Sequence, residues 1–362
     1  MRAEPGPGLG EPTDLVSVRP LWESLAAAAP NPFTTWAWAD AWWRQWGRAD
    51  RAGVRVCRRA DGSPAAVLGL CCAGRGPLRT LRWIGHGPGD ELGPVCAPAD
   101  RGLAASGLRA AVEAERRLLL ADRLRADEGW ERLLGGVVLR REPSPALRLR
   151  GDWDAYLASR SANFRQTLRR RERRLARTGG LRFRLTRDPD RLRTDLETLF
   201  ALHAARFGDR SSIRGPRTRA FHHDVAARAL AGGWLRLWIA DLDDRPAAAW
   251  YGFRLGGREW YYQAGWDPAR ARDGIGLVLL AHTVRDAMRD GMDEYRFLRG
   301  DEPFKARFGP RDDGLVTDGL APSATGRAAL SSARAALRVD PQSRAGRAAR
   351  RLASRAGWAG AA

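Results

Sequence analysis

The chain has 362 residues, of which 44% are hydrophobic and 29% are charged, a balance typical of globular proteins and not of disordered or fibrous ones. No run approaches the ~18 apolar residues of a spanning helix, and the first residues lack the apolar segment of a signal peptide, so we expect a cytoplasmic protein. The net charge of +20 is compatible with anionic partners such as nucleic acid, acidic lipid or a polyphosphate cofactor, although arginine-rich composition alone produces the same charge.

The cysteines and histidines do not predict a metal site. None of the cysteines belongs to a CxxC motif, so we interpret them as reduced thiols packed as small apolar residues: Cys57, Cys71, Cys72 and Cys96. His222 and His223 are adjacent and would point apart on a helix, and no carboxylate or cysteine has fitting spacing. We therefore expect no metal.

The first half of the chain predicts a helix followed by a small sheet. Residues 1–12 are rich in Gly and Pro and predict a flexible N-terminus. In "TTWAWADAWWRQWG" the tryptophans recur every four residues, which places them on one helical face buried against a sheet. The runs "GVRVCRRA" and "PAAVLGLCC" flank an Asp-Gly turn and predict a hairpin. "LRTLRWIG" predicts a third strand, a helix should follow within 101–121, and the prolines near residue 145 mark the end of a lobe spanning 13–148.

The second half, 149–318, begins with the basic stretch "NFRQTLRRRERRLARTGG". Phe164, Leu168 and Leu175 share one helical face, whereas arginines occupy the others. Such a run is usually a solvated helix face, but it would also suit an anionic acceptor or RNA.

A second helix, "LRTDLETLFALHAARFG", precedes three strand-like runs, "WLRLWIAD", "PAAAWYGFRL" and "REWYYQAGW". Their short turns predict an antiparallel meander. A Gly-rich loop, an amphipathic helix and the short strand "DEYRFLRG" follow. The Pro-Ala-Ala start shared by "PAAVLGL" and "PAAAWYGF" suggests that both halves use the same strand–turn–strand unit. Residues 319–362 read as a low-complexity basic tail.

The loop "DPARARDGIG" predicts an anion site at the start of the helix that follows it. A helix start presents unpaired N–H groups, and its dipole favours anions. Gly274 and Gly276 flank Ile275 at that start and would let a phosphate approach the backbone. Arg270 and Arg272 lie just upstream and are candidates to clamp its oxygens.

Lys305 is the only lysine in the chain, within "RGDEPFKARF", although arginine and lysine together number 62. The two residues are poor substitutes where a compact ammonium must reach a single oxygen. This exception indicates a site, although a single residue could also be chance.

Several motifs resemble the GNAT-superfamily acyltransferases of the CelD/BcsL, FemAB-like type. The segment from the Gly-rich turn to "RGDEPFKARF" is similar to the C-terminal signature of that family, and "LFALHAARF" resembles its "LHxxRW" element. The basic helix and the Trp-rich helix also have counterparts, so the resemblance covers about residues 15–315. It implies an α+β fold of two tandem GNAT-like lobes, each a mixed, mostly antiparallel sheet flanked by helices.

The resemblance also implies a chemistry, in which an amine attacks the thioester of acetyl-CoA or another acyl-CoA directly. The pantetheine arm would pair with backbone near Tyr262, Gln263 and Gly265, and the pyrophosphate would lie at Gly274–Gly276. Candidate catalytic residues are Asp301 and Glu302 as bases and Lys305 as counter-charge. Candidate substrate residues are His203, Arg206 and Arg299. An amino sugar or polysaccharide precursor would be the acceptor, with polysaccharide-synthesis proteins as possible partners.

Departures from the family pattern leave alternatives open. The family's cofactor loop begins with Gln or Arg, where this chain has Ala271. The aromatic pair of the family's "YKxRW" element is Phe304 and Phe308 in this chain, which removes a possible phenol hydroxyl. Asp301 and Glu302 could simply pair with neighbouring arginines. An aminoacyl-tRNA donor, as in Fem-type relatives, would suit the basic helix. A non-catalytic scaffold that binds an anionic polymer or a synthase partner is the third alternative.

Overall fold

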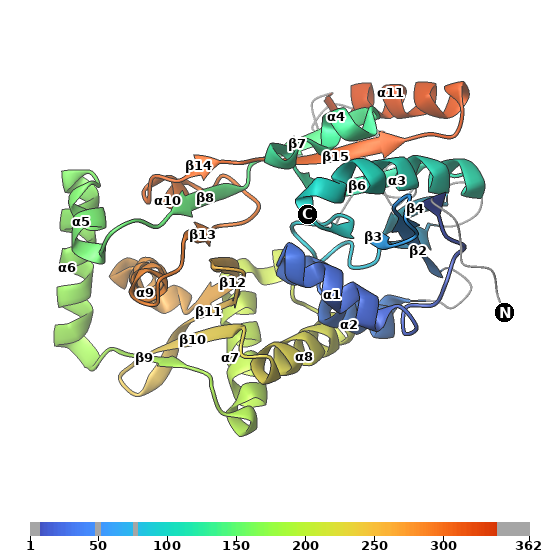
Figure 1. Ribbon diagram of the computed structural model, residues 1–362. Coiled ribbons are helices and arrows are strands. Elements are labelled where there is room, and N and C mark those ends of the chain that lie inside the picture. Colours follow the sequence, from blue (N-terminus) through green and yellow to red (C-terminus); the bar gives the residue numbers. More distant parts are fainter. Residues whose placement is uncertain (1–7, 48–51, 75–78, 339–362) are drawn as a thin grey trace. The chain divides into compact units, whose positions relative to one another are not determined.

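A computed structural model describes residues 8–47, 52–74 and 79–338 (Figure 1). The chain divides into two compact units: a first unit of residues 1–142 and 313–362, and a second unit of residues 143–312. Each unit is a mixed sheet flanked by helices, so the predicted α+β class is confirmed.

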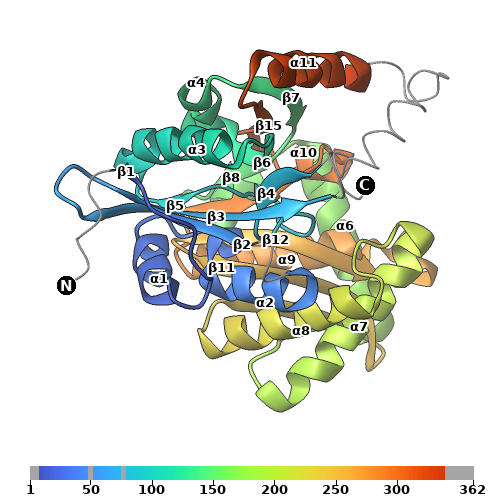
Figure 2. The ribbon, with the colours of Figure 1, turned by 90° about the vertical axis from the view of Figure 1, so that its right-hand side faces the viewer.

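In the described part of the first unit, eight strands form one sheet in the order β1-β2-β3-β4-β6-β15-β7, with β5 paired to β3. Helices α1 and α3 lie on opposite faces of β2 and β3 (Figure 2). The elements of this unit are β1 Gly8–Leu9, α1 Arg19–Ala28, α2 Trp36–Trp46, β2 Ala52–Arg58, β3 Pro64–Ala73, β4 Thr80–Trp83, β5 Val95–Cys96, α3 Arg101–Glu115, β6 Leu119–Arg125, α4 Trp130–Leu134, β7 Val137–Glu142, β15 Leu315–Leu320 and α11 Ala324–Arg338.

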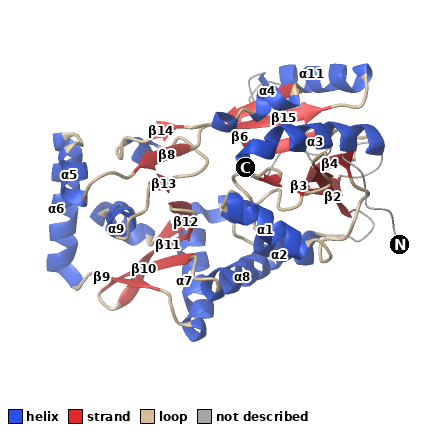
Figure 3. Cartoon of the chain, viewed as in Figure 1, coloured by secondary structure: helices blue, strands red, loops and turns tan. Residues whose placement is uncertain are grey.

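In the second unit, the strand order over the described residues is β14-β8-β13-β12-β11-β10-β9. Helices α7 and α8 pack beside the central strands (Figure 3), and α9 contacts β11 and β12. The elements are β8 Pro145–Arg148, α5 Trp153–Ala158, α6 Ala162–Gly179, β9 Arg182–Leu185, α7 Pro189–Phe207, α8 Pro216–Ala231, β10 Leu235–Leu242, β11 Arg245–Leu255, β12 Arg258–Trp266, α9 Ile275–Arg289, β13 Glu294–Arg296, α10 Pro303–Ala306 and β14 Arg311–Asp312.

The local predictions are confirmed where apolar spacing is regular. Helix α2 is capped by Thr35, whose hydroxyl accepts from the Trp38 amide, and it buries Trp38 and Trp42. The meander is β10, β11 and β12, and the basic helix is α6. The apolar face of α6 is buried as its spacing predicts, because Phe164, Leu168 and Leu175 belong to the second core.

The two units share one motif, as the Pro-Ala-Ala echo suggested. In each, antiparallel strands lead into a helix and then into a strand that pairs in parallel with the last of them. The parallel pairs are β4 with β6 around α3, and β12 with β13 around α9. The echo itself falls on β3 and β11, which are equivalent in this motif.

The predicted boundaries differ from the structure at both ends of the second unit. Strand β8 precedes residue 149 but pairs with β13 and β14 of the second sheet. Strand β15 spans the predicted end at 318 but pairs with β6 and β7 of the first sheet, and α11 packs on β7. The residues of a short apolar strand do not indicate which distant strand it pairs with, so these pairings could not be predicted from the sequence. At the N-terminus, β1 pairs with β2, and residues 1–7 and 339–362 lie outside the described part.

In the part of the chain that the structure describes, no helix is long and apolar enough to cross a bilayer. Over the same residues, no group of three or more His, Cys, Asp or Glu side chains is arranged to hold a metal ion.

Candidate functional site

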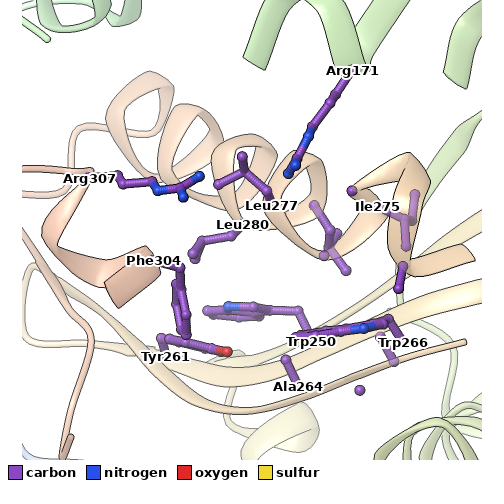
Figure 4. A pocket seen from close by; sticks show the side chains of 16 residues that line it. Arg171, Trp250, Tyr261, Ala264, Trp266, Ile275, Leu277, Leu280, Phe304 and Arg307 are labelled. Atoms are coloured by element: carbon purple, nitrogen blue, oxygen red, sulfur yellow. The ribbon is translucent and has the colours of Figure 1, made fainter. Parts of the chain in front are cut away.

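A pocket of about 300 Å³ lies in the second unit between α9 and the strands β11 and β12 (Figure 4). Its floor is formed by Trp250 and Ala264, and its sides come from the first turns of α9, from α6 and from α10. Pockets of this size that combine an apolar lining with a few polar groups are typical ligand sites.

The pocket exists because β12 extends beyond the end of its pairing with β13. Strand β13 pairs with β12 only at residues 258–260, whereas β12 continues to Trp266. Tyr261, Ala264, Gly265 and Trp266, beyond the end of that pairing, line the pocket. The register between β11 and β12 also shifts at Tyr262, which is a β-bulge. An unpaired strand edge can hydrogen-bond an extended ligand segment.

One end of the pocket is aromatic. The rings of Trp250 and Tyr261 are stacked with centroids 5.8 Å apart, and Phe304 approaches Tyr261 edge-on at 6.3 Å. Burial raises the pKa of the Tyr261 hydroxyl, while the Arg206 guanidinium, which donates a hydrogen bond to it, has the opposite effect. Because the hydroxyl accepts from Arg206, its own proton is available to a group in the pocket.

The other end is the start of α9. Gly274 is the N-cap residue with φ of 73°, and no side chain caps the helix. A Cβ atom at Gly274 would lie 2.5–2.7 Å from the Cδ, Nη1 and Nε atoms of Arg171 on α6. The left-handed backbone therefore favours glycine, and the absence of a side chain leaves room for the end of Arg171. Gly274, Ile275 and Gly276 all line the pocket, and their role in binding a cofactor stays a prediction.

Arg270 and Arg272, the predicted clamp residues, do not line the pocket. Arg270 pairs with Asp243 at 3.0 Å and with Asp273 at 3.8 Å, and Arg272 is exposed. The arginines at the pocket are Arg171 and Arg307. Spacing along the loop could not reveal this, because it does not show which side of the 3₁₀ helix Pro268–Asp273 faces the pocket.

Lys305 is a structural ammonium. Its side chain is 4% exposed, and Nζ lies 2.7 Å from the Arg299 carbonyl oxygen, 3.2 Å from that of Gly300 and 3.3 Å from that of Leu298. It also lies 2.8 Å from Oε2 of Glu302. Lys305 does not line the pocket, so it is not placed to neutralise a phosphate there as expected. It instead organises the loop formed by residues 298–302. A point-like ammonium can serve converging oxygens, which a planar guanidinium cannot.

The two candidate bases differ. Glu302 is 53% exposed on its side chain, pairs with Lys305, and its charge acts on both Arg206 and Tyr261 at the aromatic end of the pocket. Asp301 is exposed. Glu302 is therefore the carboxylate that the fold brings near the pocket. Arg299 contributes its carbonyl to the Lys305 cluster and does not line the pocket.

His203 is buried and serves packing. Its Nδ1 lies 2.8 Å from the Ser211 hydroxyl and its Nε2 3.0 Å from Oε1 of Gln263, and burial lowers its pKa to about 4. A neutral imidazole held on both nitrogens is a poor candidate for contact with substrate. The side chain of Gln263 is occupied by this bond, and Tyr262 packs against His222, Tyr251 and Phe253. Only the backbone of Tyr262 and Gln263 could therefore contact a ligand in the pocket.

Gly265 and Arg206 connect α7 to the pocket. A Cβ atom at Gly265 would lie 2.3 Å from the His203 amide nitrogen, so glycine is needed for the close approach of α7. Arg206 stacks on Trp266 with its Cζ atom 3.3 Å from the ring centroid, and it donates to the Ala264 carbonyl. Arg206 thus contacts two pocket-lining residues, Trp266 and Ala264, without lining the pocket itself.

The equivalent helix start in the first unit has a different local charge. Asp100 immediately precedes α3, is buried, and pairs with Arg59 at 2.6 Å. A carboxylate at that position already satisfies the positive end of the helix dipole. The pocket at α9 is thus a property of the second unit.

Comparisons with known proteins agree with this division. Residues 162–306 match the family described as "Acetyltransferase (GNAT) domain". The structure of FemX superposes with a TM-score of 0.59 at 13% identity, covering 82% of this chain and 95% of that one. The C-terminal domain of a putative lysylphosphatidylglycerol synthetase from Agrobacterium fabrum gives 0.58 at 13% identity, with 91% and 99% covered. At such identities the likeness is one of fold. A sequence comparison with curated proteins gives no match.

Proposed function

We propose that the GNAT-type acetyltransferase domain at residues 162–306 transfers an acyl group from an acyl-CoA thioester to an amine. The observation that carries this proposal is the pocket, which joins an uncapped helix start at Gly274–Gly276 to an aromatic end at Trp250, Tyr261 and Phe304. The first suits the diphosphate of the donor, and the second suits its uncharged acyl end. Between them, the free edge of β12 suits the amides of a pantetheine arm.

The pocket lining favours direct transfer over an acyl-enzyme intermediate. The described lining residues contain no serine, threonine, cysteine or histidine. The nitrogen lone pair of the acceptor would attack the thioester carbonyl carbon, the C–S bond would break, and CoA would leave as the thiolate. An amine must lose a proton during this step.

Glu302 and Tyr261 are the groups we assign to the proton transfers. Glu302 would accept the amine proton, directly or through water. The Tyr261 hydroxyl, which accepts from Arg206, would donate its proton toward the developing negative charge or the thiolate. Burial raises the pKa of this hydroxyl, which keeps it protonated and suits a donor role.

The acceptor we propose is an amino sugar or a related saccharide precursor, in keeping with the CelD/BcsL-type motifs. An aminoacyl-tRNA donor is the second candidate, favoured by the exposed arginines of α6: Arg169, Arg170, Arg173, Arg174 and Arg177. In that case the bond broken would be an ester.

Calorimetric titration with acetyl-CoA, followed by release of free thiol in the presence of glucosamine, tests the first candidate. We expect micromolar binding of acetyl-CoA and amine-dependent thiol release. The thiol release should be lost in the Tyr261→Phe and Glu302→Gln variants, which should still bind acetyl-CoA. Absence of heat with acetyl-CoA at millimolar concentration would contradict the acyl-CoA donor. Binding of aminoacyl-tRNA would then support the second candidate, and binding of neither donor would leave a scaffold role.

A further inference from the structure

Two arginines from different elements line the pocket around the first turns of α9. Arg171 lies on α6, and Arg307 directly follows α10. Both line the pocket, and Figure 4 shows Arg171 reaching in from one side of Leu277 and Arg307 from the other side, where Phe304 lies.

Neither guanidinium is neutralised. Within the described ranges, no carboxylate lies within ion-pair distance of Arg171 or Arg307, whereas the neighbouring Arg174 pairs with Asp273 at 2.9 Å. Asp273, the acid closest in sequence to the helix start, is therefore already occupied. Burial and the charges of Arg307 and Arg170 lower the pKa of Arg171, which indicates that the like charges act on one another.

The backbone at the helix start leaves room for Arg171. The absence of a side chain at Gly274 leaves the space that its Cδ, Nε and Nη1 atoms occupy. Ala271 also lines the pocket but offers no charge. The positive charge in the pocket is thus supplied by Arg171 of α6, beside the helix start, and by Arg307 after α10, and not by the loop.

We propose that Arg171 and Arg307 form a phosphate clamp that, together with the N-terminus of α9, holds the diphosphate of the donor. This inference rests on the proposed function. The charges are commensurate: two guanidinium groups and a helix N-terminus worth about half a charge face a group with two negative charges. Guanidinium groups are also suited to bidentate bonds with phosphate oxygens.

Binding of two thioesters separates the clamp from the rest of the pocket. Acetyl-CoA carries the diphosphate, whereas S-acetylpantetheine has the same acyl and amide groups without phosphate. We expect Arg171→Met and Arg307→Met each to weaken acetyl-CoA binding about tenfold or more, and the double variant about a hundredfold. Affinity for S-acetylpantetheine should stay within twofold of wild type. Arg193→Met, at an exposed position of α7, is the matched control and should bind acetyl-CoA normally.

The outcomes distinguish this inference from the proposed function. If wild type binds acetyl-CoA and the two variants bind it equally well, the clamp is wrong and the acyl-CoA donor stands. If wild type binds no acetyl-CoA but binds a tRNA acceptor-stem hairpin through Arg171 and Arg307, the clamp holds a nucleic-acid phosphate and the acyl-CoA donor is wrong. If wild type binds neither ligand, both are wrong.

Discussion

Replacing Lys305 by methionine should destabilise the second unit. The methylene stem is retained, but the carbonyls of Leu298, Arg299 and Gly300 lose their shared donor. Leu298 has a positive φ of 57°, so the loop that the ammonium holds together also contains backbone strain.

The magnitude follows from the burial of each partner. Hydrogen bonds to a charged group contribute about 1.5–3 kcal/mol each, and an orphaned buried acceptor costs a similar amount. The bond to the half-exposed Glu302 counts for less because water screens it. The desolvation of the ammonium, which methionine avoids, offsets part of the loss. We therefore expect a net destabilisation of about 3 kcal/mol.

Thermal denaturation followed by circular dichroism measures this effect. For a domain of 150–250 residues, about 3 kcal/mol corresponds to a fall in Tm of about 6–12 °C. Lys305→Arg should recover less than half of the loss, because its planar fork cannot converge on the same oxygens. Arg272→Met, at an exposed position, is the control. A Lys305→Met variant that melts within about 2 °C of wild type would refute the role assigned to the ammonium.

Three further predictions concern packing, protonation and catalysis. Gly265→Ala should cost more than about 2 kcal/mol in urea denaturation, because the new methyl meets the backbone of α7; Gly102→Ala, whose added Cβ would have open space, should be neutral or slightly stabilising, and equal costs would contradict the packing argument. Burial lowers the pKa of His222 to about 3, so its stabilising contribution is present above the unfolded pKa of about 6.5 and is lost as the pH falls toward 3. Relative to His222→Gln, the wild type should lose about 1.4 kcal/mol per pH unit below pH 6.5, and a constant difference between pH 7.5 and pH 5 would argue against a buried neutral imidazole. Glu302→Gln should lower kcat about 10²–10⁴-fold while the affinity for acetyl-CoA is retained; equal effects of Asp301→Asn and Glu302→Gln would remove Glu302 as the preferred base.

Regular patterns made much of the second unit predictable. The spacing of Phe164, Leu168 and Leu175 determined which face of α6 is buried, because helix geometry alone brings residues three, four and seven apart together. The meander followed from strand lengths and short turns. The start of α9 at Gly274–Gly276 was also predictable, since a helix start after a glycine loop is a local feature.

What the sequence could not show is which distant residues complete these local features. Arg171 lies about a hundred positions before the loop that it contacts, and its sequence context does not distinguish it from the other arginines of α6. Only the packing of α6 on α9 places it beside Gly274. In the same way, Lys305 was identifiable as an exception, but its role depended on three carbonyls that only the folded loop brings to one point. Local sequence patterns specify where helices and strands form and which of their faces are buried. The assignment of charges to a pocket or to the scaffold depends on tertiary contacts, because electrostatic partners are chosen by distance in space and not along the chain.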